Sequence, residues 1–258
     1  MKSLNSIRRE KILDMLRQDK QIKVNILTEK LGVTSMTVWR DLKALEKKNL
    51  LVCVHGGAVL PTNSTDELLY SKRKILNADL KNFIGKIASQ LIHSGLNIFL
   101  DGSTTAVAFA KYIKNIPDLC IFTDSLSVFF ELQKISSLRV ILLGGELQPD
   151  ENTLSGPVTI DNINRIVFDY CFFSAAGFSL DGVYNTLPTG FETKQIAMQR
   201  TKKSVLLIDS TKYSTIGSWQ LCQLNQIDIL VTDQNLQKNI ITKIQKAGVK
   251  VLASPVDI

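Results

Sequence analysis

Six short apolar runs after residue 96 each end in Gly, Asp or Ser, and they restrict the possible folds more than any other feature. The runs are NIFLDG, LCIFTDS, RVILLGG, YCFFSAAG, SVLLIDS and IDILVTD, with helical stretches between them. Apolar strands that alternate with helices are typical of a mainly parallel sheet covered by helices. Such sheets bind ligands at the carboxyl ends of their strands, where the small polar residues of this chain lie. The sequence therefore predicts an α/β domain with a ligand site at that edge.

The first fifty residues follow a different pattern, that of three short helices. Apolar residues recur at helical spacing in IRREKILDMLRQ, in KVNILTEKLGV and again in residues 34–51. Gly32 occupies a C-cap position after the second helix, and Thr34 an N-cap position before the third. A brief helix, a glycine turn and a second helix with a polar outer face indicate a helix-turn-helix. Glycine-turned helix pairs also occur in bundles that bind no DNA.

The segment NLLVCVHGGAVLP, which follows the third helix, predicts a β-hairpin that turns on Gly56 and Gly57. A helix-turn-helix with such a hairpin is a winged helix. Residues 1–60 also hold nearly all of the net charge: twelve Lys and Arg against six Asp and Glu give +6 of the chain's +7, whereas the remaining residues carry nineteen against eighteen. A basic module of this kind binds a polyanion or is simply a solvated surface.

Residues on the outer face of the third helix and at the hairpin tip are the candidates for contact with DNA. Arg40 suits a phosphate or guanine contact, and its alternative is a surface ion pair with Asp41 or Glu46. Trp39 lies on the flank of the helix, where it is either a packing residue or a contact residue. His55 is equally well explained as a turn residue. The predicted DNA-binding residues are Ser35, Met36, Thr37, Trp39, Arg40, Lys43 and His55.

These segments resemble the N-terminal signature of the DeoR family of bacterial sugar-operon regulators. TVWRDLKALEKKNLL followed by VHGGAVL is similar to the Thr-[Ile/Val]-Arg-Arg-Asp-Leu run that opens the family's recognition helix and the His-Gly-Gly-Ala that closes its wing. Trp39 stands where the first arginine is usual. The resemblance implies a DNA-binding regulator, and the departure at Trp39 leaves its operator sequence open.

The stretch LDGSTTAVAFAKYI is the most informative strand end. A strand closes at Asp101, a Gly-Ser-Thr-Thr turn follows at residues 102–105, and a helix is predicted from Ala106. Several free amides and three hydroxyls therefore converge on one point. Such helix starts hold phosphates well, whereas plain N-capping needs only one of these residues. The segment favours an anion site and leaves capping as the alternative.

Later segments resemble, in order, the blocks of the DeoR-family sensor domain: IFLDGSTT, FTDSLSV, ILLGGEL, LSGP, AAGFSLDGV and LIDSTKY. The fold of that domain is similar to ribose-phosphate isomerases, glucosamine-phosphate deaminases and CoA-transferase-like proteins. Asp124 stands where asparagine is usual, and Gly102 precedes Ser103 where the order Ser-Gly is more familiar. The segment TGFETKQIAMQR fits only loosely, so neither Glu192 nor Lys194 is assigned a ligand role.

The resemblance implies an effector that is a phosphorylated sugar or polyol. Its phosphate is expected at the turn of residues 102–105, with Lys212 as the nearby cation and other strand ends binding sugar hydroxyls. The predicted effector-binding residues are Asp101, Gly102, Ser103, Thr104, Thr105, Thr123, Asp124, Ser125, Gly144, Gly145 and Lys212.

The sequence thus predicts a winged helix-turn-helix domain at residues 1–60, a linker at 61–80 and a larger α/β effector-binding and oligomerisation domain at 81–258. We expect a cytoplasmic repressor of a carbohydrate-utilisation operon that binds double-stranded operator DNA as a dimer or tetramer, without a cofactor, metal or membrane. The four cysteines are spaced singly, unlike zinc or dithiol motifs. Two alternatives remain: an isomerase- or deaminase-like enzyme with an appended DNA-binding domain, with Asp181 as its candidate acid, and a DNA-binding scaffold without a ligand.

Overall fold

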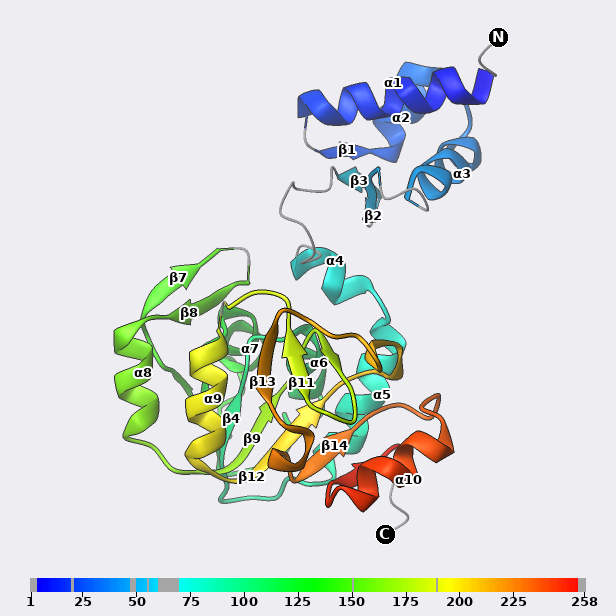
Figure 1. Ribbon diagram of the computed structural model, residues 1–258. Coiled ribbons are helices and arrows are strands. Elements are labelled where there is room, and N and C mark those ends of the chain that lie inside the picture. Colours follow the sequence, from blue (N-terminus) through cyan, green and yellow to red (C-terminus); the bar gives the residue numbers. More distant parts are fainter. Residues whose placement is uncertain are drawn as a thin grey trace. The chain divides into compact units, whose positions relative to one another are not determined.

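The computed structural model describes residues 4–19, 21–46, 50–54, 56–59, 70–149, 151–188 and 190–254. Contacts between residues divide the chain into two compact units, Met1–Ile75 and Leu76–Ile258, and each has its own core (Figure 1). Part of the expected linker, residues 61–69, lies outside the described residues. Residues 70–75 form a helix, and Leu76 already belongs to the second unit.

The first unit is a winged helix. It contains the helices α1 (Leu4–Asp19), α2 (Val24–Leu31) and α3 (Ser35–Glu46), the hairpin β2 (Val52–Val54) and β3 (Gly57–Val59), and the helix α4 (Tyr70–Ile75). A short strand between α1 and α2, β1 (Gln21–Lys23), pairs with β3 and completes an antiparallel sheet of order β1-β3-β2. The three helices and the hairpin agree with the sequence prediction, whereas β1 was not predicted.

Two glycines allow the close turns of this unit. Gly32 ends α2 with φ 63°, and its amide donates to Thr28 O at 3.0 Å, as expected for a left-handed C-cap. At Gly57, an added Cβ would lie 2.1 Å from the carbonyl oxygen of Ile22. Glycine therefore lets strand β1 approach the wing hairpin.

A buried ion pair network joins α1 to α3. Asp41 is 1% exposed, yet it lies on the face of α3 that packs into the apolar core. Arg8 Nε donates to Asp41 Oδ2 at 2.5 Å, and Arg9 Nε donates to Oδ1 at 2.8 Å. A buried carboxylate is tolerated only with such partners, so the two arginines fix the position of α1 against α3.

A seven-stranded parallel sheet forms the centre of the second unit. Its strands are β4 (Asn97–Leu100), β5 (Leu119–Thr123), β6 (Leu138–Leu142), β9 (Phe168–Phe173), β12 (Thr201–Leu207), β14 (Ile229–Val231) and β15 (Lys250–Leu252). Their spatial order is β15-β14-β12-β9-β4-β5-β6, and all neighbouring pairs are parallel. The six predicted strands are all present, and β15 is an addition.

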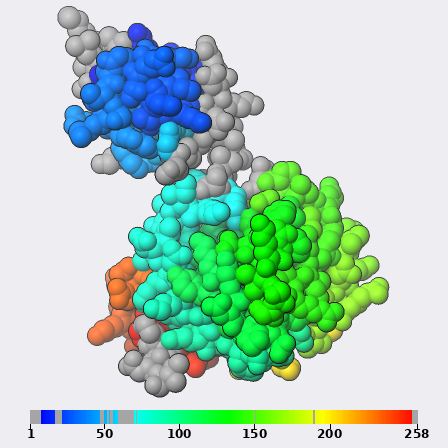
Figure 2. Space-filling model, turned by 180° about the vertical axis from the view of Figure 1, so that it is seen from behind, coloured from blue at the N-terminus to red at the C-terminus, as the bar shows by residue number. Residues whose placement is uncertain are grey.

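Helices cover both faces of this sheet (Figure 1). On one face lie α5 (Ala78–Ser89), α6 (Thr104–Ala110) and α7 (Leu126–Leu132), and on the other lie α8 (Pro157–Asn164), α9 (Phe191–Gln199) and α10 (Lys238–Lys246). Each set buries its own apolar core: Ile98 and Leu100 of β4 pack with the first set, and Phe99 packs with the second, as strand alternation requires. Figure 2 shows the molecule from the side of the cyan and green segments, to which α5, α6 and α7 belong.

Smaller elements follow the carboxyl ends of the central strands. The hairpin β7 (Glu146–Gln148) and β8 (Thr153–Ser155) comes after β6, and the sheet β10 (Gly177–Phe178), β11 (Val183–Asn185) and β13 (Trp219–Cys222) begins after β9. The short 3-10 helix η1 (Ser210–Lys212) follows β12, and η2 (Leu224–Gln226) precedes β14. All but η2 therefore start at the edge where ligand binding was predicted.

The four cysteines are free thiols. Burial raises the pKa of Cys53 to about 11 and that of Cys222 to about 12, so these thiols are neutral at pH 7. Within the described parts of the chain, no group of three His, Cys, Asp or Glu residues could hold a metal ion, and no helix is long and apolar enough to cross a membrane.

Removing Asp41 is expected to destabilise the winged helix. Asp41→Ala takes away the acceptor that Arg8 and Arg9 share, and the unfolding free energy of this unit should fall by roughly 2–3 kcal/mol, because both arginines keep part of their contact with water. As a control, Lys43→Ala removes only an exposed ion pair with Glu46 and should cost under about 1 kcal/mol. Urea unfolding followed by Trp39 fluorescence in a Trp219→Phe background measures both. Equal losses in the two variants would contradict the assignment.

Candidate functional site

The strand order of the central sheet reverses between β4 and β9. The chain enters the sheet at β4, places β5 and β6 on one side, and then places β9, β12, β14 and β15 on the other. The connections that leave β4 and β9 therefore diverge, and open α/β sheets bind ligands at such a point. Asp101 follows β4, Asp124 follows β5 and Ser174 follows β9. The topology thus gathers three polar residues, far apart in the sequence, at one edge.

Asp101 is the centre of the hydrogen bonds at this edge. Its side chain is fully buried, and Oδ1 accepts from Ser103 N at 3.0 Å while Oδ2 accepts from Ser174 N at 3.0 Å. Lys194 Nζ, from α9, lies 3.4 Å from Oδ2 and donates to Ser174 O at 3.0 Å. One carboxylate therefore connects the ends of β4 and β9 with α9.

Two lysines converge on the end of β9. Lys194 donates to the carbonyl of Ser174, and Lys212, from η1, donates to Ala175 O at 2.7 Å. The sequence assigned Lys212 but gave Lys194 no role, because its segment matched the sensor blocks only loosely. The sequence feature that could have singled out Lys194 is its position one turn into α9, the helix that follows Gly190, which has φ 68°. Two cations at one strand end suit an anionic ligand.

Asp124 and Ser174 each keep a buried side-chain oxygen that has no hydrogen-bond partner among the described residues. These atoms are Asp124 Oδ1 and Ser174 Oγ. Burial raises the pKa of Asp124 to about 8, the charge of Asp101 adds to the rise, and Lys194 opposes it. Buried polar atoms are nearly always bonded, so two unpartnered oxygens at one sheet edge mark a candidate binding site. The sequence did not single out Ser174, because a serine after a strand is typical of an ordinary turn.

Two of the predicted hydroxyl residues are helix caps. Ser103 Oγ accepts from Ala106 N at 3.1 Å and caps α6, and Ser125 Oγ accepts from Val128 N at 3.3 Å and caps α7. Helix α6 consequently begins at Thr104 and not at the predicted Ala106. The capping alternative thus accounts for the hydroxyl of Ser103, and an effector role for either hydroxyl stays a prediction.

The remaining hydroxyl residues at this edge have different surroundings. Thr123 Oγ1 donates to Leu100 O at 2.8 Å and accepts from Ser125 N at 3.0 Å, so it joins β5 to β4. Thr104 and Thr105 occupy the first two positions of α6, where backbone amides have no acceptor inside the helix. The turn therefore offers an anion the amides of Thr104 and Thr105.

Packing or backbone conformation accounts for three predicted glycines. A Cβ on Gly102 would meet Cγ2 of Thr153 at 2.0 Å, and a Cβ on Gly145 would meet Oγ1 of Thr159 at 2.0 Å. Gly144 and Gly145 also have φ values of 74° and 125°. Gly102 and Gly145 let the β7–β8 hairpin and α8 lie close to the strand ends, whereas Gly144 is explained by its backbone conformation alone. A ligand contact by any of the three stays a prediction.

Strand β8 is attached directly to the loop that follows β5. Leu154 N donates to Asp124 O at 2.7 Å, and Leu126 N donates to Asn152 O at 3.0 Å. Ser125 and Thr153 form an antiparallel bridge between these two bonds. The hairpin is therefore part of the wall beside Asp124.

The acids that could have paired with Arg40 both have other partners. Asp41 is held by the two arginines of α1, and Glu46 accepts from Lys43 Nζ at 2.9 Å. Arg40 itself is exposed on α3, and no ion pair joins it to any described residue. The guanidinium is therefore available to an external partner.

The other predicted DNA-binding residues are split between exposure and packing. Met36 is 71% exposed and Ser35 is exposed, whereas Thr37 is half-buried, with Oγ1 3.1 Å from that of Thr34. Trp39 is half-buried and packs against the winged-helix core, so its body has a structural role. His55 lies outside the described residues.

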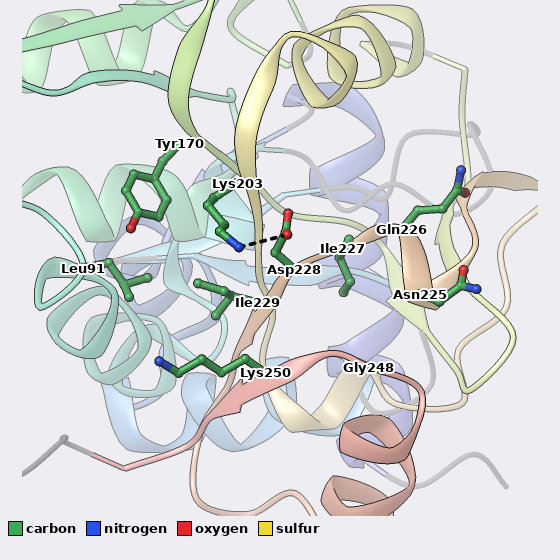
Figure 3. A pocket seen from close by; sticks show the side chains of 10 residues that line it. All are labelled: Leu91, Tyr170, Lys203, Asn225, Gln226, Ile227, Asp228, Ile229, Gly248 and Lys250. Carbon is green, nitrogen blue, oxygen red and sulfur yellow. Dashed lines mark hydrogen bonds and ion pairs between the residues drawn. The ribbon is translucent and has the colours of Figure 1, made fainter.

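A pocket of about 470 Å³ opens at the opposite, amino edge of the central sheet (Figure 3). It is lined by Leu91, Tyr170, Lys203, Asn225, Gln226, Ile227, Asp228, Ile229, Gly248 and Lys250. Its acid is already satisfied, since Asp228 accepts from Ser204 N at 2.8 Å and lies 3.4 Å from Lys203 Nζ. We therefore place the candidate site at the carboxyl edge, where buried oxygens lack partners.

Asp181, the candidate acid of the enzyme alternative, is exposed in the turn before β11. Its backbone amide donates to Ser179 Oγ at 3.0 Å. This is the usual setting of an Asp-Gly turn, and it lacks the burial that tunes a general acid.

Adding a methyl group at Gly102 is expected to push β8 away from the site. Gly102→Ala sets a Cβ against the γ-methyl group of Thr153, and overpacking of this kind costs about 1–3 kcal/mol. Thr153→Ser removes that methyl group, so the double variant should recover most of the loss, with Thr153→Ser alone as the control. Thermal unfolding of the four proteins measures the effect. A double variant no more stable than Gly102→Ala would contradict the packing explanation.

Comparison with known proteins covers both units. The DeoR-like helix-turn-helix domain matches residues 8–64, and the DeoR C terminal sensor domain matches residues 76–234. The HTH-type transcriptional regulator GolR of Listeria innocua is 34% identical over 95% of this chain and 96% of its own. The HTH-type transcriptional repressor GlcR of Bacillus subtilis is 31% identical over 95% of each chain. The lactose phosphotransferase system repressor of Staphylococcus epidermidis is 34% identical over 88% of this chain and 92% of its own.

Among solved structures, ribose 5-phosphate isomerase A of Methanocaldococcus jannaschii aligns with 53% of this chain and 55% of its own, at 18% identity and a TM-score of 0.39. That partial likeness carries no conclusion about activity. The two matched domains and the relatives, in contrast, are those of transcriptional regulators and not of enzymes. The chain therefore belongs to the DeoR family of helix-turn-helix transcriptional regulators.

Proposed function

We propose that this chain represses a carbohydrate-utilisation operon: its winged helix binds double-stranded operator DNA, and a phosphorylated sugar or polyol bound by the second unit releases the DNA. The names of the relatives support this reading, since one is a lactose phosphotransferase system repressor and another a putative aga operon transcriptional repressor. The observation that carries the proposal is the exposed Arg40 on α3, whose neighbouring acids are bound elsewhere.

The polar face of α3 is the proposed reading surface. Arg40 is suited to a bidentate guanine contact or to a phosphate, because its guanidinium is exposed and always charged. Trp39, held by the core on one side, can reach a thymine methyl or a sugar edge with the other. The proposed contact residues are Ser35, Met36, Thr37, Trp39, Arg40 and Lys43, with His55 at the wing.

The remaining features of DNA binding follow from charge and symmetry. Residues 1–60 carry +6 of the net charge, so we expect affinity to fall steeply with salt as bound counterions are released. One short recognition helix contacts few base pairs, and symmetric repetition doubles the site. A homodimer or tetramer acting in the cytoplasm, where the operator DNA is, is part of the proposal.

The carboxyl edge of the central sheet is the proposed effector site. The amides of Thr104 and Thr105 and the cation of Lys212 suit a phosphate, and Lys194 adds a second cation beside Asp101. Asp101, Thr123, Asp124 and Ser125 end the neighbouring strands and would contact sugar hydroxyls, together with Gly102, Ser103, Gly144 and Gly145 in the surrounding turns. Release of DNA requires the effector to favour the DNA-incompetent state, and a 5- to 150-fold induction corresponds to about 1–3 kcal/mol.

Arg40→Ala is expected to remove specific operator binding. Loss of a guanine contact costs about 1–3 kcal/mol, which corresponds to roughly 5- to 150-fold in affinity, and the fold should be unaffected because Arg40 is exposed. Lys11→Ala is the matched control, because Lys11 is an exposed cation on α1, outside the proposed reading surface, and its loss should weaken binding to all sequences only slightly. Binding-site selection followed by titration of the selected duplex measures the affinity of both variants. Light scattering of the complex gives the number of protein chains bound to each duplex. Equal affinity of Arg40→Ala for the same operator would contradict the assignment of α3.

Sugar phosphates, but not the matching free sugars, are expected to release the protein from its operator. The measurement is a titration of paired hexose and pentose monophosphates and sugars against the protein–DNA complex. Thermal unfolding checks direct binding, since a ligand at 100 times its Kd adds about 2.7 kcal/mol. Lys212→Ala removes a proposed cation and Thr104→Ala removes the hydroxyl beside the proposed phosphate amides, so both should lower the response severalfold.

Lys203→Ala is the control for this experiment, because Lys203 is an exposed lysine at the opposite edge of the same sheet (Figure 3). It should respond as the parent protein does. If free sugars release the DNA as well as their phosphates do, or if Thr104→Ala and Lys212→Ala respond as Lys203→Ala does, the phosphate assignment fails. A protein that no metabolite stabilises would support the ligand-free scaffold instead.

A further inference from the structure

We propose that Asp124 meets the effector as a neutral carboxylic acid and donates a hydrogen bond to one of its oxygen atoms. The inference rests on the proposed function, because it concerns the same effector site. It assigns this side chain a donor role, whereas a carboxylate at a strand end ordinarily accepts hydrogen bonds from sugar hydroxyls. It also commits the site to a ligand with an oxygen acceptor at that point, such as a phosphate or carbonyl oxygen.

The first support is that Asp124 is buried and fixed while one of its oxygens is unsatisfied. The residue is 3% exposed, and Oδ1 has no hydrogen-bond partner among the described residues. The backbone cannot turn it away, because Leu154 N of β8 holds the carbonyl of Asp124 at 2.7 Å. A charged carboxylate would therefore remain buried with Oδ1 unbonded, and only the residue's own backbone amide would offset its desolvation by a hydrogen bond.

The second support is the distribution of charge around Asp124. Among the residues that the structure describes, the charged or titratable groups that act on Asp124 are Asp101 at the end of β4, Lys194 of α9 and Cys171 of β9. The single cation among them is spent on Asp101, which also accepts from two backbone amides. Burial holds the pKa of the Cys171 thiol well above its usual value, so Cys171 is neutral. A second negative charge on Asp124 would have no partner of its own.

These two observations place the proton on Asp124 at neutral pH. Burial raises the pKa of Asp124 to about 8, with the charge of Asp101 acting in the same direction. When two carboxylates share one site, the better-solvated or better-bonded one keeps the charge and the other keeps the proton. Here Asp101 has the bonds and Asp124 has none from Oδ1. Asp124 and the three groups that face it then sum to zero charge, so an incoming phosphate meets no net repulsion.

Ionisation of Asp124 would weaken effector binding in two ways. The donor disappears, and the group of four acquires a net negative charge next to an anionic ligand. Effector affinity should therefore fall about tenfold per pH unit above pH 8 in the parent protein. Asp124→Asn keeps the shape and a neutral donor but cannot ionise, so its affinity should not show this loss.

A ligand-free experiment tests the proton itself. Because the folded pKa of Asp124 lies above its ordinary value of 3.8, the folded state binds the proton more tightly than the unfolded state between about pH 4 and pH 8. Stability should therefore fall as pH rises through that window in the parent relative to Asp124→Asn, and the difference should level off above about pH 8. The infrared difference spectrum of the two proteins should show a protonated carboxyl band at pH 6 that disappears with a midpoint near pH 8. No such band at pH 6 would overturn the proposal.

A ligand experiment tests the donor role. Inorganic phosphate and a panel of hexose monophosphates are titrated by calorimetry into the parent and into Asp124→Asn between pH 6.5 and pH 9.5. Ionisation of the phosphate affects both proteins equally, so the ratio of their Kd values is the readout. We expect a constant ratio up to about pH 7.5 and a tenfold rise per unit above pH 8. If Asp124→Asn does not fold, Asp124→Ser supplies the neutral comparison.

The outcomes separate this inference from the proposed function. Binding of a sugar phosphate with a ratio that stays flat to pH 9.5 would overturn the role of Asp124 and leave the effector site intact. Binding of no probe by either protein would overturn the proposed effector class, and the donor role with it. A rising ratio together with the infrared band would support both.

Discussion

The buried carboxylate of Asp101 is the interaction on which the rest of the second unit depends. It sits at the point where the strand order reverses, and it accepts hydrogen bonds from the segments that follow β4 and β9 as well as the ion pair from α9. Without these bonds, two diverging connections would have to meet around an unsatisfied charge. The same residue therefore stabilises the fold and decides which neighbouring group carries charge.

The winged helix also contains a buried carboxylate held by cations, but the ratio of carboxylates to cations is different. Asp41 has two arginines for one carboxylate, so both of its oxygens are neutralised and α1 is fixed against α3. At the sheet edge the ratio is reversed, with two carboxylates to one facing lysine. The first arrangement is complete in itself and suits a rigid scaffold. The second leaves Oδ1 of Asp124 without a hydrogen-bond partner among the described residues, as expected of a group in a binding site.

Local features of the sequence predicted most of the fold, and long-range contacts account for what was missed. Six strands, the C-cap at Gly32 and the wing hairpin follow from periodicity and turn chemistry, which act within a few residues. Strand β1 is three residues long and exists because it pairs with β3, and no local pattern reveals that. Lys194 and Ser174 join the site only through the topology of the sheet. The hydroxyl of Ser103 caps α6, and its predicted role toward an anion stays a prediction, because capping and anion binding call for the same residue types.

The attachment of β8 to the loop after β5 has a consequence for how such a protein diversifies. The wall beside Asp124 is built by a hairpin that contributes no strand to the central sheet and whose exposed strand β7 carries little of the core. Surface hairpins tolerate exchange far better than central strands do. Substitutions in this segment could reshape the wall while the strand ends and their charges remain as they are. The hairpin can therefore differ from one related protein to the next while the central sheet and the residues at its strand ends stay the same.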